Sequence, residues 1–185
     1  LRPYSHRLRL IVTNTAPQGN KASLTLTASG TATNLRTLII TDADGNSHTF
    51  TVDTSAGVST STVIGTSGAG SAQAQAIRVW DALTLAVIAG NLNIDPGEKP
   101  GTTVDTITIT QRTRGTAGNT AVTGTFGDST AFLTAEGGSA ATANSFDGGT
   151  AEKIYIERLE VSRRRYLALH GGSNTRGPPT QEYGL

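Results

Sequence analysis

The side chains best suited to metal chemistry in this chain are its three histidines, His6, His48 and His170, which stand far apart in the sequence. Neutral imidazole is a common metal ligand, but a site also needs further ligands close by. The chain has no cysteine, which excludes disulfides and thiolate ligands. We therefore interpret the histidines as exposed or locally hydrogen-bonded, and we predict neither a metal ion nor any other cofactor.

A calcium loop is the second candidate, because Asp42-x-Asp44-x-Asn46 is followed by Asp53 eleven residues after Asp42. Carboxylate and amide oxygens at this spacing suit a hard cation. However, the calcium pattern needs glycine at its sixth position, which is serine here, and glutamate at its twelfth, which is Asp53. An aspartate–glycine turn at residues 44–45 explains the same run, because glycine accepts the positive φ of tight hairpin turns. We interpret the run as a hairpin turn.

Catalytic and phosphate-binding patterns are incomplete. Glycines at positions 65, 68 and 70 precede a predicted helix, but Ser71-Ala72 stands where a phosphate loop needs lysine and serine or threonine. The Gly-x-Ser-x-Gly pattern of many serine hydrolases is absent. Aromatic residues make up 5% of the chain, which argues against a dedicated sugar-stacking cleft, and Trp80 is interpreted as a core residue of the helix. We predict that the chain is not an enzyme.

Charge is distributed unevenly along the chain. Residues 18–150 contain six Lys and Arg against ten Asp and Glu, whereas residues 1–17 contain three Arg and no acid, and residues 151–185 contain six Lys and Arg against four Glu. Basic ends on an acidic middle can bind a neighbouring subunit. The candidate partner-contact residues are Arg7, Arg9, Arg163, Arg164, Arg165 and Tyr166. An acidic protein partner is favoured for the arginine run; contact with nucleic-acid phosphates and a solvated run without a partner are the alternatives.

The elements that must position these residues are mostly strands. Alternation of apolar and polar residues predicts strands in 6–14, 21–29 and 104–110, and it is strict in 21–29. The Asp44-Gly45 turn signal between two apolar runs predicts a hairpin over 35–53. Shorter strands are predicted near 62–64 and 120–126, and a strand is preferred to a helix over 153–161. The apolar stripe of residues 71–89, with Ser71 as its cap and Gly90 after it, predicts one helix. Residues 91–103 are expected to form turns.

Composition supports a β-rich fold. Threonine is abundant and favours strands, and the 22 glycines favour turns. We predict an α+β, mainly β fold, in which an antiparallel sheet carries one packed amphipathic helix and the two ends form extended arms. The predicted organisation is an N-terminal strand and arm region over 1–34, a central module over 35–150 with the helix 71–89, and a C-terminal strand and basic arm over 151–185. No stretch of 18 apolar residues suggests a membrane span.

The central region contains several motifs in a defined order. An aspartate–glycine hairpin, an alanine-rich helix and a Thr-Ile-Thr-Ile-Thr strand are followed by Gly115-Thr116-Ala117-Gly118-Asn119 and by Phe146-Asp147-Gly148-Gly149. This order resembles a module that recurs in structural proteins of tailed bacteriophages, in tail, baseplate and capsid-surface positions. The resemblance covers roughly residues 35–150, and it brings no catalytic residues.

The resemblance implies a structural subunit of a virion, assembled in the host cytoplasm and held by other copies of itself and by other virion proteins. Tail, baseplate, connector and capsid-surface locations all remain open, and a homo-oligomer is expected. The alternative is a glycan-binding adhesin module, either carried on a particle or secreted.

Overall fold

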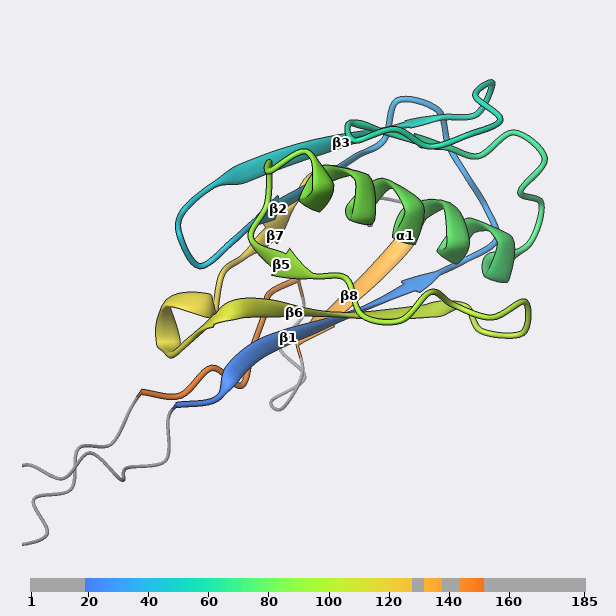
Figure 1. The fold of residues 1–185 in the computed structure, drawn as a ribbon. Helices are drawn as coiled ribbons and strands as arrows, with labels where there is room; N and C mark the ends of the chain where they lie inside the picture. The colour runs from blue at the N-terminus through green and yellow to red at the C-terminus, as the bar shows by residue number, and fades with distance from the viewer. Residues whose placement is uncertain (1–18, 128–131, 138–143, 152–185) are drawn as a thin grey trace, which may run out of the picture. The chain divides into compact units, whose positions relative to one another are not determined.

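The computed structural model describes residues 19–127, 132–137 and 144–151, all of which belong to one compact unit, Ala16–Lys153. We call the described part of this unit the body. The strands predicted over 6–14 and 153–161, and both arms, lie outside the described residues. Within the body, two four-stranded sheets and one long helix confirm the predicted fold class of a mainly β protein with a single packed helix (Figure 1).

The first sheet is antiparallel and has the order β5-β6-β1-β8. Its strands are β1 (Lys21–Ala28), β5 (Ile94–Asp95), β6 (Thr106–Arg114) and β8 (Leu133–Gly137). In β1 every second side chain is buried, from Ala22 to Ala28, while the serine and threonines between them face outward. This is the alternation that a strand shows when one face packs on a core and the other meets solvent.

The second sheet has the order β4-β3-β2-β7. Strands β2 (Thr37–Thr41) and β3 (Ser47–Asp53) form the predicted hairpin, while β4 (Val63–Gly65) runs parallel to β3 and β7 (Val122–Thr123) pairs antiparallel with β2. Gly45 has a φ of 86°, so the hairpin turn uses the left-handed conformation that glycine adopts readily.

The helix α1 (Ala72–Ile88) begins and ends as predicted. The Ser71 side chain accepts a hydrogen bond from the backbone N–H of Ala74 at 3.1 Å, and Gly90 follows the helix with a φ of 75°. The buried helix face contacts β1 and β6 of the first sheet and β4 of the second. One core therefore lies between the helix and both sheets, and its largest fully buried side chains include Leu24, Leu26, Phe50, Leu83, Ile107, Ile109 and Phe132.

Two features of the fold differ from the organisation expected from sequence. Strand β8 lies in a segment rich in Ala, Gly and Ser, where no strand was predicted, and β5 lies in the predicted turn region. Strand β1, which sequence patterns grouped with the N-terminal region 1–34, pairs with β6 on one side and β8 on the other, inside the first sheet. The body therefore begins before β1, and its hydrophobic core depends on that strand.

Candidate functional site

The six predicted partner-contact residues, Arg7, Arg9, Arg163, Arg164, Arg165 and Tyr166, lie outside the described residues, as do His6 and His170. What the structure describes is the point at which the segments carrying them join the body. Gly19 and Ala151, the first and last described residues of the body, lie side by side: a Cβ added at Gly19 would meet the backbone of Thr150 and Ala151. Figure 1 shows both ends of the body at the same place.

Hydrogen bonds hold these two ends together. The Asn20 backbone N–H donates to Thr150 Oγ1 at 2.8 Å, and the Thr150 N–H donates to the Asn20 carbonyl oxygen at 3.4 Å. The Arg114 guanidinium donates through Nη1 to the Gly19 carbonyl oxygen at 3.1 Å. We name this arrangement the terminal clasp, and define it by Gly19, Asn20, Arg114, Asn119, Gly149 and Thr150.

The terminal clasp is where the two glycine-containing motifs of the central region meet. The Asn119 side chain accepts from the Gly149 N–H at 2.9 Å and donates through Nδ2 to the Gly149 carbonyl oxygen at 3.1 Å. A Cβ at Gly149 would clash with the Gly115 carbonyl oxygen and lie 2.7 Å from Asn119 Oδ1. Glycine is therefore required by space at this position, and the motifs 115–119 and 146–149 act together as one hydrogen-bonded unit.

The segment leading into the clasp joins the two sheets. Residue Ser23 of β1 exchanges backbone hydrogen bonds with Asp147 at 2.8 and 3.0 Å. On the other side, the Val122 N–H of β7 donates to the Asn144 carbonyl oxygen at 2.7 Å, and Phe146 is 1% exposed. Residues 144–150 therefore form backbone hydrogen bonds with both sheets and bury the ring of Phe146, and these interactions fix the C-terminal end of the body to both sheets.

A buried carboxylate organises the hairpin turn of the second sheet. The Asp42 side chain is fully buried. Its carboxylate accepts hydrogen bonds from the backbone N–H groups of Asp44 at 3.0 Å, Asn46 at 2.9 Å and Asn93 at 2.9 Å. It also accepts a hydrogen bond from the Asn46 side-chain amide at 3.1 Å. Burial acts to raise the pKa of Asp42, but these hydrogen bonds together hold the pKa below its ordinary value of 3.8. The hairpin-turn interpretation of this run is confirmed, since the carboxylate oxygens bind backbone N–H groups.

Gln111 of β6 connects the same turn to the first sheet. Its buried side chain accepts from the Ala43 N–H at 2.9 Å and donates to the Thr41 carbonyl oxygen and to Thr120 Oγ1, both at 3.2 Å. These donors and acceptors satisfy one another, so the arrangement stabilises the packing of the sheets and leaves no polar group directed at a ligand.

The remaining residues singled out for chemistry have local partners. His48 Nε2 lies 2.6 Å from the Ser61 carbonyl oxygen, and the ring packs edge-on against Phe50 with centroids 4.8 Å apart. The indole of Trp80 packs partly against the core, donates to the Gly97 carbonyl oxygen at 3.1 Å, and has Lys99 Nζ 5.2 Å from its ring centroid. No group of three or more His, Asp or Glu residues that could hold a metal ion occurs within the described part of the chain.

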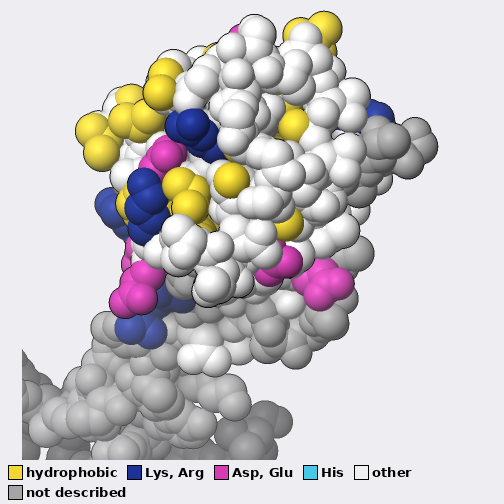
Figure 2. All heavy atoms as spheres, turned by 90° about the vertical axis from the view of Figure 1, so that its right-hand side faces the viewer, with side chains coloured by type: hydrophobic (Ala, Val, Ile, Leu, Met, Phe, Trp, Pro, Cys, Tyr) yellow, Lys and Arg dark blue, Asp and Glu magenta, His cyan; other side chains and the backbone are white. Residues whose placement is uncertain are grey.

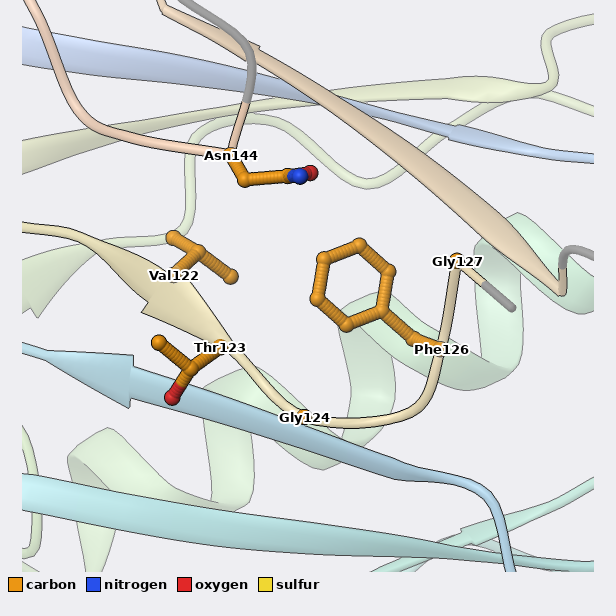
Figure 3. Close-up of a pocket in the computed structure, with 6 residues that line it drawn as sticks. All are labelled: Val122, Thr123, Gly124, Phe126, Gly127 and Asn144. Carbon is orange, nitrogen blue, oxygen red and sulfur yellow. The ribbon is translucent and has the colours of Figure 1, made fainter.

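A surface hollow of about 310 Å³ lies beside β7 (Figure 3). The side chains of Val122, Phe126 and Asn144 are directed toward it, and Thr123, Gly124 and Gly127 complete the lining. None of these six residues has an ionisable side chain, so the described lining supplies no acid, base or nucleophilic carboxylate. Figure 2 shows a face of the body that is mostly neither hydrophobic nor charged, as the threonine and glycine content suggests.

Comparisons with known proteins identify no relative. No protein-family model, no curated protein sequence and no solved structure matches this chain. No helix within the described residues is long and apolar enough to cross a membrane.

Proposed function

We propose that the chain is a non-enzymatic structural subunit of a bacteriophage virion, in a tail, baseplate, connector or capsid-surface position, and that it is attached through its basic ends. The observation that carries the proposal is the terminal clasp: the Asn20–Thr150 hydrogen bonds bring both ends of the body to one place. A body with adjacent ends can be presented on a larger assembly without distortion of its own core.

Charge supports the same arrangement. Residues 1–17 carry three arginines and no acid, and residues 151–185 carry a further excess of Lys and Arg over Glu. Both basic segments join the body at the clasp, through Gly19 and Ala151, so the body links them at one point of attachment. Linked binding segments gain affinity together, because binding of one raises the effective concentration of the other.

The test is incorporation into purified particles produced by the genome that encodes the chain, measured by quantitative mass spectrometry. A variant with Arg7, Arg9, Arg163, Arg164 and Arg165 replaced by glutamine is expected to incorporate at least about fivefold less than the unsubstituted chain, an estimate based on about 0.2–1 kcal/mol for each lost ion pair. Replacement of the same five residues by lysine keeps the charge and is the matched control.

Absence of the unsubstituted chain from particles would refute the proposal, and so would wild-type incorporation of the glutamine variant. A glycan array probed with the full chain tests the alternative. Consistent binding to one glycan class by a chain that particles do not contain would instead favour a secreted glycan-binding adhesin.

A further inference from the structure

A basic patch lies on the outer face of the first sheet, beside the terminal clasp. Arg112 and Arg114 are two residues apart in β6 and both are exposed, whereas Gln111 is buried; the pairing of β6 with β1 is irregular between Thr110 and Arg114. Lys21 of β1 is the cross-strand partner of Arg114 and is exposed, like both arginines. We define the basic patch as Lys21, Arg112 and Arg114.

The patch concentrates half of the positive charge of the body. The described residues contain six Lys and Arg, and the three outside the patch are Arg36, Arg78 and Lys99. Lys99 forms an ion pair with Asp81 at 2.8 Å, whereas Lys21 and Arg112 form no ion pair within the described residues. The patch is also next to the clasp, since Arg114 donates to the Gly19 carbonyl oxygen. The basic end segments therefore start where the patch lies.

The chemistry of the surroundings favours carboxylates over nucleic acid as the partner. The outward side chains that continue the patch along β1 and β6 are the hydroxyls of Ser23, Thr25, Thr108 and Thr110, and no aromatic ring lies among them. Proteins that bind single strands on a sheet face stack bases on aromatic rings. Arginine, in contrast, binds a carboxylate with two parallel hydrogen bonds.

A second copy of the chain offers such carboxylates. The described residues contain nine Asp and Glu, namely Asp42, Asp44, Asp53, Asp81, Asp95, Glu98, Asp105, Glu136 and Asp147. Of these, Asp44, Asp95, Glu98 and Glu136 are exposed. Asp95 and Glu136 share the outer face of the first sheet with the patch, opposite Thr110 of β6 and Thr25 of β1. An acidic body with a basic patch is complementary in charge to another copy of itself.

We infer that the basic patch is a docking surface for the acidic body of a second copy. The inference rests on the proposed function and specifies its partner. The contact joins the basic patch of one copy to exposed carboxylates of the next. The association should weaken with salt, since the screening length falls from about 10 Å at 0.1 M to about 3 Å at 1 M.

The experiment is sedimentation velocity of the full chain over a concentration series, at about 0.1 M and 1 M salt. The variant K21Q/R112Q removes two patch charges and keeps Arg114, which holds the clasp. The control R78Q/K99Q removes the same number of charges elsewhere on the body. K21Q/R112Q is expected to raise the self-dissociation constant about tenfold at low salt, the factor for two lost interfacial ion pairs. The control should change it less than about threefold.

Equal effects of the two variants, in a chain that self-associates and enters particles, would overturn the inference and leave the proposed function standing. A chain that neither associates nor enters particles would refute both. Nucleic-acid binding is tested separately, by fluorescence anisotropy of a labelled 30-nucleotide DNA. DNA binding that K21Q/R112Q abolishes, with self-association unchanged, would assign the patch to nucleic acid and overturn the inference.

Discussion

Replacement of Asp42 by alanine should destabilise the body strongly, although the residue lies in a turn. Its carboxylate accepts four N–H groups, and one of them comes from Asn93, 51 residues away in the chain. A hydrogen bond from a part-buried N–H to a charged group contributes about 1.5–3 kcal/mol, because the donor is left without a partner when the charge is removed. The N–H groups of Asp44 and Asn46 belong to exposed residues and can form hydrogen bonds with water in the variant. Their lost bonds to Asp42 therefore add only about 1 kcal/mol in total to the loss in free energy of unfolding. We expect a total loss of about 3 kcal/mol.

The assay is urea unfolding followed by circular dichroism at neutral pH. With an m-value of about 2 kcal/mol per molar, a loss of about 3 kcal/mol lowers the midpoint by about 1.5 M. Asp44→Asn is the matched control, since Asp44 is exposed and accepts the Asn93 side-chain amide at 2.7 Å, an interaction worth less than about 1 kcal/mol. A midpoint for Asp42→Ala within about 0.3 M of the unsubstituted chain would refute the account of Asp42 as the organiser of this turn.

The same carboxylate predicts a pH dependence. Because its hydrogen bonds lower the pKa of Asp42 below 3.8, the charged form is preferred in the folded state. The stability it contributes is therefore present above the unfolded-state pKa and is lost as pH falls below that value, through the lower pKa of the folded state. The difference in free energy of unfolding between the unsubstituted chain and Asp42→Asn should shrink below about pH 4. A difference that stays constant down to pH 2.5 would contradict this mechanism.

Three further substitutions test the clasp, the helix and the core by thermal or urea unfolding. Gly149→Ala should lower the free energy of unfolding by about 1–3 kcal/mol, because the added Cβ meets the Gly115 carbonyl oxygen and Asn119. Gly57→Ala is the control and should be close to neutral, since its added Cβ meets nothing within 4 Å. Equal stabilities of the two variants would rule out tight packing at the clasp. Ser71→Ala should lower the free energy of unfolding by about 1 kcal/mol through loss of the helix cap, and Ser71→Asp should restore the cap. Unchanged stability of Ser71→Ala would exclude a capping contribution. Phe146→Ala should cost about 3–5 kcal/mol, since the ring is 1% exposed, and a loss below about 1 kcal/mol would show that residues 144–150 are not part of the core.

Local patterns in the sequence determined the elements that depend on neighbours along the chain. The alternation of Ala22 to Ala28, the aspartate–glycine turn and the capped apolar stripe of 71–89 each specify an element within fewer than twenty residues, and each is present. Strand β8 was missed although Leu133, Ala135 and Gly137 alternate with exposed residues, because two of its three buried positions are small and carry little hydrophobic signal.

Only the tertiary structure decided how distant residues meet. The pairing of Asn119 with Gly149, the reach of Asp42 to Asn93 and the contact of Asn20 with Thr150 join residues 30, 51 and 130 positions apart. Hydrogen-bond donors and acceptors occur at nearly every residue, so local spacing does not select a partner; packing of the two sheets and the helix does. The sequence by itself showed that the chain has basic ends and an acidic middle, whereas the fold showed that both ends of the body meet at one clasp beside a basic patch.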